Sequence, residues 1–244
     1  MRNLRLDICY DGSRYRGWQR LPGKDDTIQA KIENVLSRIL DEPIEISGSG
    51  RTDAGVHAQG QVANFHCQSQ MPCAQILALL RQYLPEDIGI LDCKEASERF
   101  HARLNAREKT YCYRVWNSDM PCVFQRKYVA VMPEKLDLAA MRAAADRLEG
   151  EHDFSAFCGN PKYKKSTVRF LRSIRLEKKG QELQLSFTGD GFMHHHIRIL
   201  VGTLVEVGRG QRSAESVSDL FGAKRSEAGF LAPAQGLCLM EVQY

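Results

Sequence analysis

The order of strand and helix patterns in the first 104 residues limits the possible fold most strongly. Residues 4–12 alternate between apolar and polar side chains, as in a half-buried strand, and residues 25–40 carry an apolar stripe at helical spacing behind an Asp/Thr cap. Strands are expected at 43–46 and 62–65, then a helix over 72–84 and a strand over 87–96. This β-α-β-β-α-β order predicts a ferredoxin-like unit over residues 1–104.

The remaining residues, 105–244, predict a similar series of elements. It comprises strands at 109–117 and 128–132, a helix at 136–150, a hairpin turning at 178–180, a helix at 194–208, a short helix near 214–222 and a strand at 237–244. We therefore expect an α+β protein of two tandem ferredoxin-like (RRM-like) units, 1–104 and 105–244, with a central, mostly antiparallel sheet. No low-complexity linker separates them, which indicates closely packed halves.

Composition is that of an ordinary globular protein. The chain has 244 residues, of which 43% are hydrophobic and 26% charged, enough to bury a sizeable core. No apolar run reaches the roughly 18 residues of a membrane span, and no signal peptide is evident, so we expect a cytoplasmic protein. The eight cysteines lack C-x-x-C or zinc spacing and are expected to be free thiols.

Basic residues gather in three places beside aromatic residues or glycines. The clusters are Arg14, Arg16 and Arg20; Arg99, Arg103, Arg107 and Lys109; and Lys162, Lys164, Lys165 and Arg169. This combination suits a phosphate backbone with unstacked bases, as in RNA loops. Scattered solvated charge is the alternative, because 34 Lys and Arg are balanced by 30 Asp and Glu.

The segment GSGRTDAGVHAQGQ, residues 48–61, carries four glycines and a single acid, Asp53. It does not complete G-x-G-x-x-G, because Asp53 stands where a glycine is needed, and a carboxylate would repel phosphates, so a dinucleotide site is not expected. Asp53 is either a turn former or a functional carboxylate. Arg51 favours the second reading, since a nearby cation lowers the pKa of an acid, and the glycines allow close approach to a large ligand.

Two other kinds of site find little support in the residues. His194, His195 and His196 are consecutive, so on a helix they point about 100° apart, and no carboxylate or cysteine follows at useful spacing. We expect no metal site, and packing, polarity at a helix start or RNA contact remain as readings of the three histidines. A hydrolase lacks G-x-S-x-G and would have to use scattered residues.

The stretch GRTDAGVHA at 50–58 resembles the signature of the tRNA pseudouridine synthase A (TruA) family. Further similar segments follow in the family's order: YDGSRYRGWQR (10–20), FHARLNAREKTYCYRVWN (100–117), EGEHDFSAFC (149–158), GFMHHHIRILVGTLVEVGRG (191–210) and APAQGLCL (232–239). The resemblance covers nearly the whole chain. It implies the pseudouridine synthase fold, an isomerase without ATP, metal or redox cofactor, and a homodimer that binds tRNA.

The resemblance also implies roles for individual residues. Asp53 matches the catalytic aspartate, Tyr111 the tyrosine that stacks on the target base, and Arg198 the arginine that pairs with the aspartate. Arg51 matches the arginine implicated in extruding the uridine. The residues expected to bind the RNA substrate are Arg14, Arg16, Arg51, His57, Arg103, Lys109 and Tyr111.

The implied reaction converts uridine to pseudouridine at positions 38, 39 and/or 40 of the tRNA anticodon stem-loop. Asp53 could add to the base, attack C1′ or remove a proton from C2′, and the sequence leaves these open. One departure concerns Ile199, where the family usually has Asn after the matched arginine. Substrate choice therefore stays open, with a paralogue acting on ribosomal RNA as the alternative. A non-catalytic RNA-binding module is a second alternative.

Overall fold

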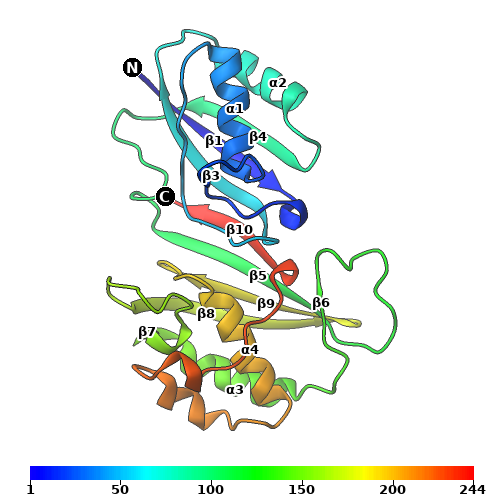
Figure 1. Ribbon diagram of the computed structural model, residues 1–244. Coiled ribbons are helices and arrows are strands. Elements are labelled where there is room, and N and C mark those ends of the chain that lie inside the picture. Colours follow the sequence, from blue (N-terminus) through cyan, green and yellow to red (C-terminus); the bar gives the residue numbers. More distant parts are fainter. The chain divides into compact units, whose positions relative to one another are not determined.

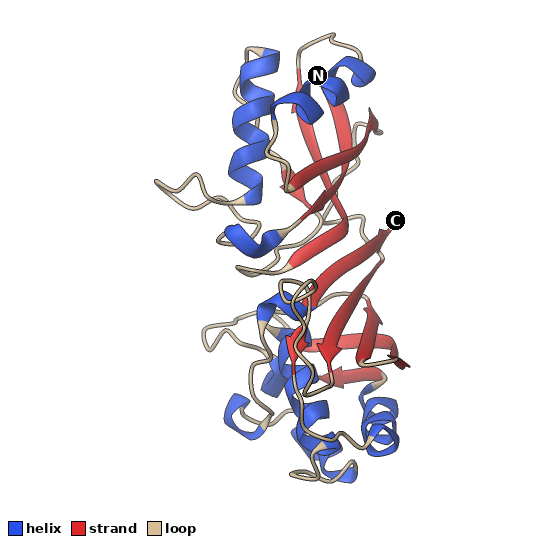
Figure 2. Ribbon diagram, turned by 90° about the vertical axis from the view of Figure 1, so that its right-hand side faces the viewer, coloured by secondary structure: helices blue, strands red, loops and turns tan.

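The structure is a computed structural model that describes residues 1–244 (Figure 1). The chain forms two compact units, the first made of Met1–Arg107 and Leu239–Tyr244 and the second of Glu108–Cys238. Each unit combines a layer of strands with helices packed beside it (Figure 2). None of the helices has the length and apolar character that crossing a membrane requires.

The sheet of the first unit is built around strand β1 (Arg2–Tyr10). β1 pairs antiparallel with β3 (His57–Cys67) on one side and with β4 (Ile88–Glu95) on the other. The short β2 (Ser47–Gly48) also pairs with β3, and β10 (Leu237–Gln243) lies beside β3. A Cβ at Gly60 would lie only 2.3 Å from the Met240 carbonyl oxygen, so these strands approach closely.

Two helices complete the first unit, and both follow the expected positions. α1 (Ile28–Leu40) begins at Thr27, whose Oγ1 accepts the Ala30 N–H at 3.3 Å, and it buries the stripe Ile28, Ile32, Leu36 and Leu40. α2 (Cys73–Tyr83) buries Ile76 and Leu80 and packs against α1 and β4. The predicted helices at 25–40 and 72–84 are thus confirmed, and the elements follow the order β-α-β-β-α-β.

The predicted strand at 43–46 is wrong, because those residues form no ladder. The Ile44 N–H donates to Ser37 Oγ at 2.9 Å and the Ile46 N–H to Glu33 Oε1 at 3.0 Å, so side chains of α1 take the place of a neighbouring strand. β3 in turn begins at His57, inside the segment expected to be a loop. The loop between β2 and β3 is therefore residues 49–56.

The second unit has its own sheet, in the order β5-β9-β8-β7. β5 (Glu108–Trp116), β9 (Glu182–Gly189), β8 (Val168–Lys179) and β7 (Gly150–Asp153) pair antiparallel in turn, and β6 (Ala130–Val131) runs parallel to β5. Tyr113, Leu185 and Phe187 are fully buried in this unit. β7 has no counterpart among the predicted strands.

Helices α3 (Leu138–Leu148) and α4 (His196–Gly208) pack against each other in the second unit. The helix expected near 214–222 is the 3-10 helix η3 (Glu215–Leu220), and shorter 3-10 helices are η1 (Gly12–Arg14), η2 (Ser155–Phe157), η4 (Arg225–Glu227) and η5 (Ala234–Gly236). None of the eight cysteines forms a disulfide. The mixed, mostly antiparallel α/β class is confirmed, whereas the description as two tandem ferredoxin-like units stays a prediction.

The boundary between the units differs from the expected division into 1–104 and 105–244. The chain enters the second unit at Glu108 and returns to the first at Leu239. The last six residues belong to the first unit because β10 lies along β3. The two ends of the chain therefore meet in the sheet of the first unit.

Candidate functional site

The loop of residues 49–56, which carries Asp53, is held closely against the segment 10–18 of the same unit. The Trp18 N–H donates to the Thr52 carbonyl at 3.0 Å. A Cβ on Gly17, whose φ is +97°, would lie 2.6 Å from that carbonyl oxygen, and a Cβ on Gly12 would lie 2.0 Å from the Val56 carbonyl oxygen. Only glycine allows the two backbones to come this close.

The backbone is restrained on both sides of Asp53. Before it, the Thr52 hydroxyl hydrogen bonds with the Tyr10 hydroxyl at 2.8 Å, in buried surroundings. After it, the Val56 N–H donates to the Asp53 carbonyl at 3.2 Å in a turn whose Gly55 has a φ of +78°. Asp53 itself is half-buried. The loop thus offers one carboxylate from a well-defined backbone position.

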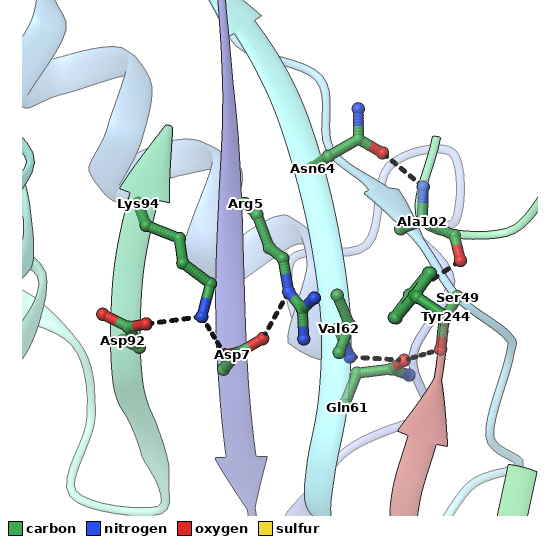
Figure 3. A network of polar contacts seen from close by, with 10 residues as sticks. All are labelled: Arg5, Asp7, Ser49, Gln61, Val62, Asn64, Asp92, Lys94, Ala102 and Tyr244. Carbon is green, nitrogen blue, oxygen red and sulfur yellow. Dashed lines mark hydrogen bonds and ion pairs between the residues drawn. The ribbon is translucent and has the colours of Figure 1, made fainter. Parts of the chain in front are cut away.

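Gln61 of β3 supports the start of the same loop (Figure 3). Its Oε1 accepts from Ser49 Oγ at 2.6 Å and its Nε2 donates to the Gly50 carbonyl at 3.1 Å. The Ser49 N–H donates to the Val62 carbonyl at 2.7 Å. Gln61 and Ser49 are fully buried, so these bonds are protected from water.

His57, expected to bind RNA, has a structural role in the first unit. Its Nδ1 accepts the Gly12 N–H at 3.1 Å, and Asp11 Oδ1 lies 3.2 Å from the same nitrogen. Both contacts hold the buried ring against residues 11 and 12 of the first unit.

The arginines Arg14, Arg16 and Arg51 of the first unit are all exposed, and two of them form ion pairs. Arg51 is exposed, two residues before the half-buried Asp53. Arg14 pairs with Asp87 at 2.6 Å, and Arg16 pairs with Asp26 at 2.6 Å, where the guanidinium lowers the pKa of the Asp26 carboxyl. Both arginine side chains remain more than half exposed, so they can still face a polyanion.

Arg103, also in the first unit, is exposed. Its neighbour Ala102 is held by hydrogen bonds of its backbone (Figure 3). The neighbouring Ala102 N–H donates to Asn64 Oδ1 at 2.8 Å, and the Ala102 carbonyl accepts from the Tyr244 hydroxyl at 2.8 Å. The guanidinium is therefore presented by an ordered support, separate from the loop of Asp53.

The remaining expected site residues, Lys109, Tyr111 and Arg198, belong to the second unit. Lys109 and Tyr111 are on β5, and the Tyr111 ring meets Phe192 edge-on with ring centroids 5.2 Å apart. Arg198 is on α4, and its Nε donates to the Ala232 carbonyl at 2.7 Å. The Ala232 N–H donates back to the Arg198 carbonyl at 3.1 Å, so both the backbone and the side chain of Arg198 bond to Ala232.

Two further residues of helix α4, His196 and Ile199, are buried in the second unit. His196 is fully buried among Phe154, Phe157 and Phe192, and burial lowers the pKa of its imidazole to about 3. Packing is thus the role that the structure gives this histidine. Ile199 is also fully buried, so the departure from the family pattern at this position lies in the core of the second unit.

Sequence reasoning missed the residues that support the site. Tyr10, Trp18 and Thr52 restrain the loop of Asp53, and Phe192 packs on Tyr111. Tyr10, Trp18 and Phe192 lie within the segments quoted for the family resemblance, as does Thr52 within GRTDAGVHA. Their place in these segments could have marked them as candidates, but the sequence does not show which of their atoms are in contact.

Known proteins are similar to this chain over its full length. A family model described as tRNA pseudouridine synthase matches residues 8–105 and 144–244, which include Arg51, Asp53 and Arg198 but not Lys109 or Tyr111. Curated relatives named tRNA pseudouridine synthase A 2 are 44% identical in Bacillus cereus (strain ZK / E33L) and 40% identical in Clostridium perfringens (strain 13 / Type A). Each alignment spans 245 residues and covers 100% of both chains.

One solved structure, a Cbf5-Nop10-Gar1 complex, has a chain that aligns with 97% of this one and is itself covered over 48%. Its TM-score of 0.40 and identity of 11% are too low for a structural comparison to add to the family match. The family model and the full-length relatives show the family of this chain without that structure. This chain belongs to the tRNA pseudouridine synthase A family.

Proposed function

We propose that this protein isomerises uridine to pseudouridine in tRNA, at positions 38, 39 and/or 40 of the anticodon stem-loop. Membership of the family supports the reaction and the class of RNA. The observation that carries the proposal within the molecule is the placement of Asp53. A single half-buried carboxylate stands on a loop whose backbone is hydrogen bonded both before and after it. Preorganised geometry of this kind is what a reacting group requires.

The reaction is an isomerisation, so the nucleotide has the same composition before and after it. The bond between C1′ and N1 breaks, a bond between C1′ and C5 forms, and the C5 proton leaves while N1 gains one. Asp53 supplies the carboxylate, whether it removes a proton from C2′, attacks C1′ or adds to the base. The target nucleotide leaves the stack of the RNA to reach it, as for other enzymes that act on a base.

The other site residues take the roles that the resemblance implies. Tyr111 stacks on the uracil, Arg198 pairs with the catalytic carboxylate, and Arg51 takes part in extruding the uridine. Arg14, Arg16, His57, Arg103 and Lys109 contact the RNA substrate. The exposed arginines of the first unit support this assignment, since phosphate contacts need cations at the surface. His57 is the least accessible of the set, because its ring is buried.

We also propose that the protein acts as a homodimer. Its support is the segment from Met120 to Val131, where five large apolar side chains are exposed: Met120, Val123, Phe124, Tyr128 and Val131. Phe124 is 94% exposed. Met, Phe, Tyr and Arg are the residues that protein interfaces favour, and Arg126 adds to this set. A second copy of the chain is the partner that would cover this segment.

A paralogue acting on ribosomal RNA remains the alternative substrate. Ile199, where the chain departs from the family pattern, is fully buried and is therefore a poor candidate for choosing an RNA. A tritium-release assay on tRNA and ribosomal RNA transcripts labelled at uridine C5 tests the proposal. The wild type should release tritium from tRNA alone, and Asp53→Asn should release none while binding tRNA as tightly. Release by Asp53→Asn, or from ribosomal RNA alone, would contradict it.

A further inference from the structure

A pair of buried hydroxyls stands next to the proposed catalytic residue. Tyr10 Oη and Thr52 Oγ1 are 2.8 Å apart, and the two side chains are 5% and 7% exposed. Thr52 immediately precedes Asp53 in the chain. Its backbone carbonyl is held as well, by the Trp18 N–H at 3.0 Å. The residue before the carboxylate is therefore held at both its side chain and its backbone.

The sheet places Tyr10 for this contact. β1 and β3 keep regular pairing as far as Ile8 and Gln61, after which Tyr10 lies opposite Ala58. β3 uses one more residue than β1 over this interval, which is a bulge. A second irregularity occurs between β1 and β4 at Asp7 and Ile8. Bulges commonly redirect a side chain beside an active site.

A short buried bond between hydroxyls restrains rotation of Thr52. Its side chain is β-branched, so fixing the hydroxyl also restricts χ1 and the adjoining backbone. The carboxylate direction of Asp53 depends on that backbone. A displacement of about 1 Å at a reacting group can cost about a hundredfold in rate.

We propose that Tyr10 and Thr52 are positioning residues, whose hydroxyl–hydroxyl bond orients the backbone from which Asp53 presents its carboxylate. This inference rests on the proposed isomerase function. The bond acts through Asp53, so it contributes to the rate of the chemical step rather than to RNA affinity. Its two members should act as one unit.

The test is a double-mutant cycle of Tyr10→Phe and Thr52→Val in the full chain, read by single-turnover tritium release from tRNA with enzyme in excess. Each single variant should slow release roughly tenfold, and the double variant should be no more than about twofold slower than either, because one bond is lost in all three. Thr52→Ser keeps the hydroxyl, so its rate should stay within about twofold of the wild-type rate. The dissociation constant for tRNA should not change.

The control is Tyr83→Phe. Tyr83 belongs to the same unit, at the end of α2, and its side chain is exposed and outside the loop of Asp53. Removing its hydroxyl should leave the single-turnover rate unchanged. Equal slowing by Tyr83→Phe, independent effects that multiply in the double variant, or a loss confined to RNA affinity would overturn the proposal.

A readout without activity separates this inference from the proposed function. Backbone amides of residues 52–56 should exchange hydrogen faster in Tyr10→Phe and Thr52→Val than in wild type and Tyr83→Phe. Unchanged exchange would overturn the positioning role, even in an active enzyme. If wild type releases no tritium from tRNA, the proposed function fails, whatever the exchange experiment shows. If wild type releases tritium and Asp53→Asn does not, the proposed function stands, and the double-mutant cycle then tests the positioning role alone.

Discussion

The imidazole of His196 packs against the ring of Phe154, with ring centroids 4.9 Å apart, and neither of its nitrogens has a hydrogen-bond partner. Burial is the main cause that lowers the pKa of His196 to about 3, and the charge of Arg169 acts in the same direction. The native protein therefore holds this histidine neutral. An unfolded chain would protonate it near pH 6.5.

The consequence is a loss of stability in acid. Between the unfolded pKa of 6.5 and the folded value of about 3, only the unfolded state takes up the proton, so the free energy of unfolding falls as the pH falls. At pH 5 the loss relative to pH 7.5 should be about 2 kcal/mol greater in wild type than in His196→Met, which keeps the volume but does not titrate. Urea unfolding at the two pH values measures this difference. Equal losses in both proteins would contradict the assignment.

The close approach of Gly12 to Val56 predicts that Gly12→Ala is damaging. The new Cβ would lie 2.0 Å from a backbone oxygen, so the segment 10–18 and the loop of Asp53 must separate. We expect the free energy of unfolding to fall by about 1–3 kcal/mol, together with slower isomerisation. Gly191→Ala is the control, because its Cβ would meet only side-chain atoms of Arg169, at 3.8 and 3.9 Å. A control as unstable as Gly12→Ala would argue against the contact.

The exposed Arg103 should contribute one phosphate contact. Arg103→Ala is expected to weaken tRNA binding and to reduce the slope of log affinity against log salt by about 1. Arg38→Ala removes the same charge from the exposed end of α1, outside the three basic clusters, and should leave the slope unchanged. Titrations at several salt concentrations compare the two. The same slope for Arg103→Ala and wild type would remove Arg103 from the RNA-binding set.

The exposed Phe124 should matter for association of two chains. Phe124→Ser is expected to raise the dimer dissociation constant at least about tenfold, as truncation of a central aromatic residue in an interface does. Sedimentation velocity over a range of protein concentrations measures it. Leu104→Ser is the control, because Leu104 is an exposed apolar residue (77%) in the first unit, outside the segment 120–131. A monomeric wild type at every concentration would contradict the homodimer.

Local signals predicted the elements whose hydrogen bonds are themselves local. α1 was predictable because the Thr27 cap and the apolar stripe lie in one continuous segment. The segment 43–46 was not, because its alternating pattern resembles a strand while its N–H groups bond to side chains of α1. β10 was recognisable as a strand, but its place beside β3 depends on pairing between residues far apart in sequence.

The candidate site was likewise predictable only where its features lie within one short segment of the sequence. Asp53 stood out because one acid among four glycines is visible in a short segment. The bond between Tyr10 and Thr52 joins residues 42 positions apart, so no local pattern contains it. Three successive histidines give no indication that His196 is buried, since burial depends on Phe154 and Phe157 from another segment.

The most direct measurement is a carbodiimide map of pseudouridine in total RNA from cells lacking this gene, complemented with wild type or with Asp53→Asn. The account predicts that signals in the anticodon arm of tRNA disappear on deletion, return with the wild type and stay absent with Asp53→Asn. Signals in ribosomal RNA should be the same in all strains. Return of the tRNA signals with Asp53→Asn, or their persistence in the deletion strain, would contradict the central claim.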